Sequence, residues 1–269
     1  MNHQDRGHGV PPRDVEAGLR ELGRRPAPDT LLPGVLRQLG LGFWYAPAES
    51  SLGTVLVAHG PAGVVAVRRG TDGAEFEAWF REHRGGAVHP AAALPEALAT
   101  AVAAGLRGDG RGVDVDLGGL TEFQRDVLGA TRTIPRGEVR TYGWVAREIG
   151  RPGAVRAVGT ALGHNPIPLL IPCHRVVQGD WRLGQYSGGG PEAKRRVLAA
   201  EGVDAADLEA LARSRVRFHG SDTTRIFCVP TCRAARRIRD DHRVAFGSER
   251  EARSAGYRPC RLCRPAAAA

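Results

Sequence analysis

The stretch TYGWVAREIGRPGAVRAVGTALGHNPIPLLIPCHRVV, residues 141–177, decides the fold expected for the centre of this chain. It holds two short runs with helical periodicity, TYGWVAREIG and GAVRAVGTALG, joined by the Arg-Pro-Gly sequence at 151–153. Two short helices with a tight link favour a helix-turn-helix. Upstream, Thr121 and Gln124 have the spacing of a capping box, so another helix is expected to begin there. The centre of the chain is therefore predicted to be mainly helical.

The second helix of the pair is expected to have two different faces. Its core face holds three apolar residues at i, i+3 and i+7: Val155, Val158 and Leu162. The outward face then carries one arginine and two small residues: Arg156, Gly159 and Thr160. Such a surface permits close approach of a nucleic-acid backbone.

A further helix is predicted over PEAKRRVLAAEG, residues 191–202, and it carries a glutamate on its apolar face. Ala193, Val197 and Glu201 are spaced four apart and share one side of this helix. An unpaired buried carboxylate is costly, so Glu201 needs a partner. His174 is the candidate partner.

Cys173 precedes His174 in the apolar run IPLLIPCHRVV. A thiol has a pKa of about 8.5 and must lose its proton before it can attack an electrophile. A histidine that is oriented by a carboxylate can accept that proton, so Cys173, His174 and Glu201 could act together. A buried structural cysteine remains the alternative on these residues alone.

Residues 41–118 alternate between strand and helix signals and are predicted to form a small α/β domain. The expected elements are a hairpin at 52–60 and 63–69, helices at 75–83 and 94–108, and a strand at 113–117. Residues 1–40 are expected to be a partly disordered extension with short amphipathic stretches at 15–23 and 31–40.

The chain has 269 residues and a formal net charge of +9. Residues 213–264 carry 14 Arg and five Asp or Glu, so this segment accounts for the whole excess. Concentrated arginine suggests a polyanionic partner such as nucleic acid, although a solvated basic surface is the alternative. With no secretory signal and no membrane-spanning run, a cytoplasmic protein with no membrane partner is expected.

Four cysteines close to the end of the chain have the spacing of a metal site. Cys228, Cys232, Cys260 and Cys263 form two short-spaced pairs, which in a reducing compartment predicts a tetrahedral Zn²⁺ site. Two disulfides are the alternative. Because the segment has few large apolar residues, metal binding is expected to supply much of its folding energy.

The chain from Thr121 to Glu201 resembles the active-site domain of the O6-alkylguanine-DNA alkyltransferases. The shared motifs are Pro-Cys-His-Arg-Val at 172–176, TEFQRDVL, TIPRGEVRTYG, RAVGTALGHNP and YSGG. The resemblance implies a ribonuclease H-like α/β domain at 41–118 and a helical helix-turn-helix domain at 119–203. A linker at 204–216 and a small α+β zinc domain at 217–265 are expected to follow.

That resemblance also implies roles for individual residues. Cys173 would accept the alkyl group of O6-alkylguanine, and of O4-methylthymine, without a cofactor, while His174, a water and Glu201 relay its proton. Tyr142 would protonate the leaving base, and Asn165 would brace the turn before the thiol. The DNA contacts would come from Arg156, Gly159, Thr160, Tyr186 and Ser187. The partner would be alkylated double-stranded DNA, bound by a monomer that reacts once.

The segments IFCVPTCRAARR and GYRPCRLCRP resemble the zinc domain of bacterial Ada proteins. This implies that Cys228 is a second acceptor, for methyl groups on phosphotriesters. Because methylation of one of four zinc-bound thiolates changes the charge of the site from −2 to −1, tighter DNA binding is expected afterwards. In Ada the zinc domain comes first and a regulatory region follows, whereas here the order is reversed, and Val229 stands where a basic residue is expected. A zinc module that only binds DNA, a methylation-sensing regulator and an unrelated cysteine hydrolase are the competing hypotheses.

Overall fold

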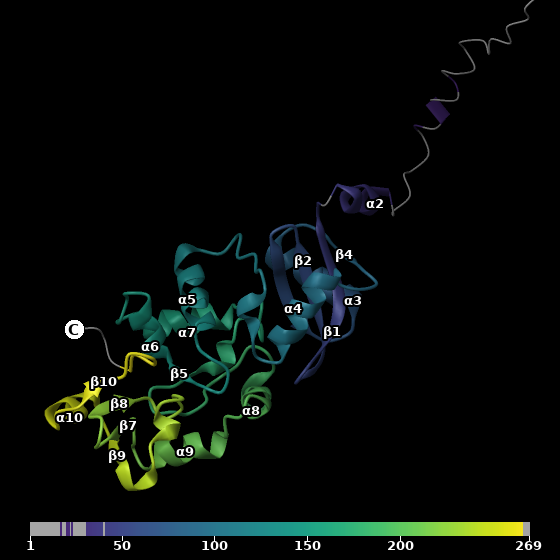
Figure 1. Ribbon diagram of the computed structural model, residues 1–269. Coiled ribbons are helices and arrows are strands. Elements are labelled where there is room, and N and C mark those ends of the chain that lie inside the picture. Colours follow the sequence, from purple (N-terminus) through teal and green to yellow (C-terminus); the bar gives the residue numbers. More distant parts are fainter. Residues whose placement is uncertain (1–16, 18–19, 22, 24–30, 40, 266–269) are drawn as a thin grey trace, which may run out of the picture. The chain divides into compact units, whose positions relative to one another are not determined.

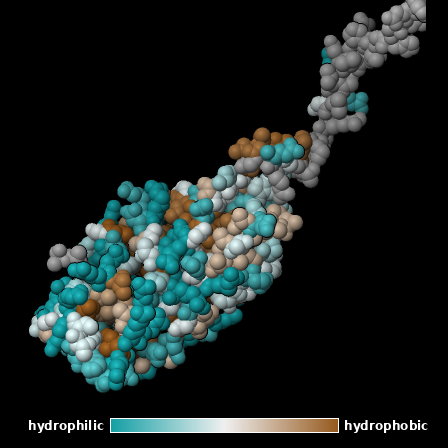
Figure 2. Space-filling model, viewed as in Figure 1, coloured by the Kyte–Doolittle hydropathy of each residue, from teal (hydrophilic) through white to brown (hydrophobic). Residues whose placement is uncertain are grey.

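The computed structural model describes residues 17, 20–21, 23, 31–39 and 41–265 (Figure 1). The chain divides into two compact units, Met1–Gly42 and Phe43–Ala269. The described helix of the first unit is α2, Leu31–Gln38, whose exposed Leu31, Leu32 and Val35 give it an apolar surface (Figure 2). The disorder expected for the first 14 residues, and most of the stretch at 15–23, lie outside the described residues.

The second unit begins with a four-stranded sheet in the order β3-β2-β1-β4. Its strands are β1 (Phe43–Ser50), β2 (Gly53–Gly60), β3 (Gly63–Arg69) and β4 (Val88–Pro90). The first three are antiparallel, and β4 runs parallel to β1. The hairpin expected at 52–69 is confirmed, but β1 was not expected, because it contains Pro47, Glu49 and Ser50 and lacks a β-branched run.

Two helices cover opposite faces of this sheet, because alternate strand residues point to opposite sides. Phe76 and Phe80 of α3 (Gly73–Arg84) pack against one face, and Val102 and Leu106 of α4 (Glu96–Leu106) against the other. Both helices confirm the sequence-based expectation. The strand expected at 113–117 is wrong: this stretch follows the short 3-10 helix η1 (Gly110–Gly112) and makes a single bridge, Val64 to Val115.

The following helices form the central domain. They are α5 (Glu122–Arg132), α6 (Tyr142–Glu148), α7 (Val155–Gly163) and α8 (Gly190–Ala200). The capping box of Thr121 and Gln124 and the helix pair α6–α7 are confirmed. Two short strands, β5 (Arg140–Thr141) and β6 (Val176–Val177), pair in parallel, and the 3-10 turn η2 (Cys173–Arg175) leads into β6.

The core face of α7 differs from the expectation at one position. Val158 and Leu162 are buried, but Val155 is 40% exposed because it lies in the first turn, and Ala161 is buried on the core side instead. Arg156 and Thr160 face solvent as expected, whereas Gly159 is half-buried.

The remainder of the chain is one linking helix and a small module. The expected helical linker is α9 (Ala205–Arg213). The module has strands β7 (Phe218–Ser221), β8 (Ile226–Cys228), β9 (Arg243–Phe246) and β10 (Arg258–Pro259) in the order β10-β8-β7-β9. It also holds helix α10 (Glu249–Ser254) and the 3-10 turns η3 (Ala235–Arg237) and η4 (Asp240–His242). Its own apolar cluster of fully buried residues is small: Phe227, Phe246, Ala252 and Tyr257.

The module shares a second core with the central domain. Val139, Val177, Leu198 and Leu208 pack in one cluster with Val229 and the four module cysteines. A charged contact borders this cluster. Glu138 Oε2 lies 2.6 Å from Arg140 Nη2, and Glu138 Oε1 accepts a hydrogen bond from the backbone N–H of Arg233 in the module. The two parts of the chain are therefore packed together as well as linked.

Within the part of the chain that the structure describes, no helix is both long enough and apolar enough to cross a membrane.

Breaking the Glu138–Arg140 pair is expected to destabilise this unit strongly. Both side chains are at most 4% exposed, so Glu138→Ala leaves a buried, unpaired guanidinium and should cost about 3–5 kcal/mol. The matched control is Glu75→Ala, which breaks the exposed pair with Arg68 and should cost less than about 1 kcal/mol. Urea unfolding of both variants with zinc present measures the difference, and equal small losses would contradict the prediction.

Candidate functional site

Cys173 is the first residue of η2 and is only 5% exposed. The side-chain amide of Asn165 donates to its Sγ over 3.2 Å and to the Ile171 carbonyl over 3.0 Å. The Asn165 Oδ1 accepts from the backbone N–H of Ile167, also over 3.0 Å. Asn165 thus holds both ends of the turn that precedes the thiol, and it contacts the thiol itself.

The environment of Cys173 keeps its proton in place. Burial raises the pKa of the Cys173 thiol, while the Asn165 hydrogen bond and the positive charge of Lys194 oppose this rise without cancelling it. A thiol with a raised pKa is protonated near neutral pH, so reaction at this sulfur requires a base.

His174 is 1% exposed, and its Nε2 lies 3.1 Å from Glu201 Oε1. Burial lowers the pKa of His174 more than Glu201 raises it, so the imidazole is neutral near pH 7. Among the protein atoms that the structure describes, its Nδ1 is buried and has no hydrogen-bond partner. The expected contact between His174 and Glu201 is therefore present, and the other ring nitrogen of His174, Nδ1, is available to accept a proton.

Glu201 caps the C-terminus of α8 and shares its buried face with Ala193 and Val197, as expected. Burial alone would raise the pKa of Glu201, but hydrogen bonds from His174 and Arg175, together with the positive charge of Arg175, outweigh it and lower this pKa to about 2. The carboxylate is therefore ionised at any neutral pH and can stabilise a protonated His174.

Two buried cations of this site were not found from the sequence. Arg175 donates to Glu201 Oε2 (2.8 Å) and Oε1 (2.7 Å), and also to the carbonyls of Ile134 and Gly108. Lys194 is fully buried, and its Nζ donates to the Val176 and Leu183 carbonyls. Burial lowers the pKa of Lys194 to about 8. The available signal was Lys194's position three residues before Val197, on the buried side of α8.

Two tyrosines lie close to the thiol. Tyr142 is the first residue of α6, and burial, followed by the charge of Cys173, raises the pKa of its hydroxyl. The Tyr186 ring stands edge-on to His174 with centroids 6.2 Å apart, and burial raises its pKa as well. Ser187 follows on the exposed side of the loop. The structure thus brings Tyr142 and Tyr186 to the site, with both hydroxyls protonated at neutral pH.

The residues expected to contact DNA lie on α7. Arg156 and Thr160 are exposed, and the Thr160 hydroxyl donates to the Arg156 carbonyl over 3.3 Å. At Gly159, a Cβ would lie 3.9 Å from the Tyr142 ring, so this helix passes close to that tyrosine. One face of the helix therefore meets the site while the other meets solvent.

The four C-terminal cysteines converge in the module. Cys228, Cys232, Cys260 and Cys263 are buried free thiols, and their Sγ atoms all lie within 4.8 Å of one another. Tetrahedral Zn²⁺ with Zn–S bonds of about 2.3 Å separates its sulfurs by about 3.8 Å. The donor set and its geometry fit zinc. The alternative of two disulfides is not found, because all four cysteines are free thiols. These four residues form the zinc-binding site of the C-terminal module.

A groove of about 530 Å³ opens beside this zinc site. Cys228 and Cys260 contribute to its wall, and four arginines line it: Arg237, Arg239, Arg258 and Arg261. A basic groove against a zinc-bound thiolate suits a phosphate group.

Comparison with known proteins identifies two parts of the second unit, the central domain and the module. Residues 122–203 match the model of the 6-O-methylguanine DNA methyltransferase DNA-binding domain, and residues 211–266 match that of the metal-binding domain of Ada. A methylated-DNA–protein-cysteine methyltransferase of Mycolicibacterium paratuberculosis is 53% identical over 89 residues, which are 33% of this chain and 53% of that protein. The protein of the same name from Methanothermobacter thermautotrophicus is 48% identical over 100 residues, covering 35% of this chain and 55% of its own length.

The chain thus spans about half the length of these curated relatives. A solved structure titled as Mycobacterium tuberculosis OGT in complex with DNA is 35% identical, covering 61% of this chain and 98% of that one, with a TM-score of 0.47. The assignment follows from the two family models and the motifs they cover: residues 122–203 belong to the 6-O-methylguanine DNA methyltransferase family, and residues 211–266 belong to the family of Ada metal-binding domains.

Proposed function

We propose that this protein repairs DNA by direct reversal, moving the alkyl group of O6-alkylguanine, and of O4-methylthymine, irreversibly to Cys173. The observation that carries this proposal is the thiol held by Asn165 beside the buried His174–Glu201 pair, within the matched family segment. The relatives named methylated-DNA–protein-cysteine methyltransferases support it. The product is a thioether with no facile hydrolytic exit, so each molecule acts once.

The proton of Cys173 passes to His174 through a water. His174 Nδ1 is the acceptor that fits, because Nε2 is already engaged with Glu201. The resulting imidazolium is stabilised by a carboxylate that stays ionised, and Arg175 keeps that carboxylate in place. The thiolate sulfur then bonds to the alkyl carbon as the carbon–oxygen bond to guanine breaks.

The leaving guanine takes up a proton so that it departs as a neutral base. Tyr142 is the donor, since its raised pKa keeps the hydroxyl protonated. Tyr186 and Ser187 line the base pocket. The Tyr186 hydroxyl is buried and has no partner among the described protein atoms, so it is free to contact the base.

The alkylated base must leave the duplex to reach a buried thiol. Flipping a nucleotide costs a few kcal/mol, and an inserted side chain offsets part of the lost stacking. Arg156, exposed on α7, is placed to enter the stack, while Gly159 and Thr160 allow the backbone to come close. The proposed partner is therefore alkylated double-stranded DNA. The protein is proposed to act as a monomer in the cytoplasm.

The zinc-bound Cys228 is proposed as a second acceptor, for the methyl group of a DNA methylphosphotriester. Zinc keeps a coordinated thiol deprotonated at neutral pH. The four arginines of the adjoining groove support a phosphate contact there, and Val229 is buried and supplies none. Methylation changes the site from −2 to −1, which favours DNA binding.

The domain limits are part of the same proposal: extension 1–40, α/β domain 41–118, active-site domain 119–203, linker 204–216 and zinc domain 217–265. A ribonuclease H-like fold for residues 41–118 is supported by the strand order β3-β2-β1-β4 with only β4 parallel to its neighbour.

Methyl groups should be found on two cysteines. The protein is incubated with duplexes that carry O6-methylguanine or a methylphosphotriester. Peptide mass mapping is expected to place the methyl group of O6-methylguanine on Cys173 and that of the phosphotriester on Cys228. Cys173→Ala should lose only transfer from O6-methylguanine. Cys228→Ala should lose transfer from the phosphotriester but still carry a methyl group on Cys173 at the end point of the reaction. Methyl on Cys173 alone would leave zinc a purely structural or DNA-binding role, and turnover without protein methylation would refute the whole proposal.

The pH profile should reveal the relay. Because His174 has a lowered pKa and Cys173 a raised one, the thiolate–imidazolium pair is a constant fraction of the enzyme between about pH 6.5 and 8.5. The single-turnover rate constant should be flat there and fall in acid. In His174→Gln the thiolate must form directly, so the rate constant should be lower and rise about tenfold per pH unit. Parallel profiles for the two proteins would contradict the relay.

Arg156 should matter only when a base must leave a duplex. Arg156→Ala is expected to slow transfer from duplex DNA about tenfold or more, because stacking is no longer replaced. Transfer from free O6-benzylguanine should be unchanged. Arg195→Ala, at a partly exposed arginine of α8 paired with Glu209, is the control and should alter neither reaction. Equal loss with both substrates would mean that Arg156 acts on the site rather than on the DNA.

A further inference from the structure

The zinc module holds the segment 139–144 of the central domain at its first residue. Thr231 stands next to the zinc ligand Cys232 in the chain. The Val139 backbone N–H donates to Thr231 Oγ1 over 3.1 Å, and that hydroxyl donates back to the Val139 carbonyl over 3.3 Å. One side chain of the module therefore satisfies both backbone groups of Val139, just before β5 begins.

The last residue of the segment is held by a zinc ligand itself. Trp144 Nε1 donates to the backbone carbonyl of Cys263 over 2.9 Å, and the tryptophan is only 4% exposed. The guanidinium groups of Arg140 and Arg264 lie 5.5 and 5.9 Å from the Trp144 rings. One turn further along α6, Arg147 donates to the Pro265 carbonyl over 3.1 Å. The outward side of α6 is thus covered by residues 263–265.

The residues between these two contacts lead directly to the thiol. Arg140 and Thr141 form β5, which pairs with β6, and β6 follows Cys173–Arg175 without interruption. Tyr142 comes next and begins α6. A displacement of the segment would therefore move Tyr142 relative to Cys173.

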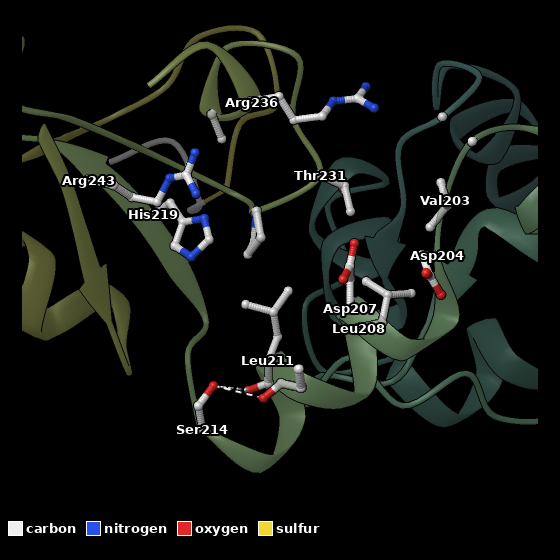
Figure 3. Close-up of a pocket in the computed structure, with 15 residues that line it drawn as sticks. Val203, Asp204, Asp207, Leu208, Leu211, Ser214, His219, Thr231, Arg236 and Arg243 are labelled. Atoms are coloured by element: carbon white, nitrogen blue, oxygen red, sulfur yellow. Dashed lines mark hydrogen bonds between the residues drawn. The ribbon is translucent and has the colours of Figure 1, made fainter. Parts of the chain in front are cut away.

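On its other side, the module packs against α9 through apolar side chains such as Leu208 and Ala235. A cavity of about 550 Å³ lies between α9 and the module, with Asp204 and Asp207 on one side and His219 and Arg243 on the other (Figure 3). No hydrogen bond between these two groups crosses it in the described structure. Polar contact near the zinc ligands is therefore concentrated on residues 138–148.

We propose that the zinc site is a structural support of the alkyl-transfer site: metal binding fixes residues 139–144 and thereby Tyr142, with Thr231 and Trp144 as positioning residues. The module's own apolar core is small, so the positions of Thr231 and Cys263 depend on the metal. The inference rests on the proposed role of Cys173. It adds that transfer to Cys173 depends on a zinc ion that takes no part in that reaction.

Coupling of this kind is reciprocal, so it can be measured from either side. Thr231→Val keeps the side-chain shape but removes both bonds to Val139, and Trp144→Phe removes only the indole donor. Each variant is expected to release zinc to a chromogenic chelator about three- to tenfold faster than the unaltered protein, as loss of one or two hydrogen bonds predicts. Thr133→Val and Trp79→Phe, which change the same residue types away from the module, should release it at the unaltered rate.

Metal removal tests the coupling from the zinc side. In the chelated full-length protein, hydrogen exchange is expected to accelerate at residues 139–149 as well as 228–263, but not in the sheet of residues 43–69. The single-turnover rate constant for O6-methylguanine should fall roughly tenfold or more, as displacement of a catalytic group predicts. When zinc is added back to the same sample, the slow hydrogen exchange and the rate constant should both be recovered.

The outcomes separate the two proposals. If zinc-loaded protein fails to methylate Cys173, the proposed function falls. If zinc-loaded protein is methylated on Cys173, but chelated protein reacts equally fast and its hydrogen exchange at residues 139–149 is unchanged, the inference falls and the proposed function stands. Unaltered zinc release from both variants would also overturn the inference, and this measurement does not require the metal-free protein to remain folded.

Discussion

The site depends on one buried ion pair, Arg175 with Glu201. The guanidinium binds both carboxylate oxygens and also the carbonyls of Ile134 and Gly108, so it joins η2, the end of α8 and two loops. Removing a single partner of such a pair leaves an uncompensated buried charge, which gives these segments a strong common constraint. His174 binds one of the same oxygens. The orientation of the His174 ring is thus set by the same ion pair that joins these segments.

This arrangement also explains how a thiol can be both buried and reactive. Burial raises the pKa of Cys173, which protects it from adventitious oxidation while no substrate is bound. The Asn165 amide and the Lys194 ammonium limit that rise, because each stabilises negative charge at the sulfur. Lys194 is in turn held by the backbone carbonyls of Val176, in β6, and of Leu183, in the loop that also carries Tyr186. For the proposed single-use reaction, the thiol would thus stay inactive until an alkyl group is presented to it.

Sequence periodicity predicted helices and their buried positions correctly where one face of a helix packs against one core. The helix pair, the capping box at Thr121 and the burial of Glu201 follow from such patterns. It failed at Val155, since a first-turn residue need not follow the stripe, and at 113–117, where alternation without partner strands gave a single bridge. It also missed β1, in which packing between β2 and β4 overrides weak strand propensity. Arg175 and Lys194 were missed because their partners are carbonyls distant in sequence, which no local pattern encodes.

The packing of the zinc module against the central domain is the feature that the sequence predicts least well. A motif with four cysteines specifies a metal site, yet nothing in its spacing says which surface will cover it. Trp144 carries the relevant information: on the outward side of a helix-turn-helix it would be an exposed aromatic residue, and here it is buried by the peptide of Cys263. Because Trp144 belongs to α6 and Cys263 to the metal site, neither environment can form fully without the other. The central domain and the zinc module form one structural unit through this shared boundary. Their order along the chain matters less than this contact.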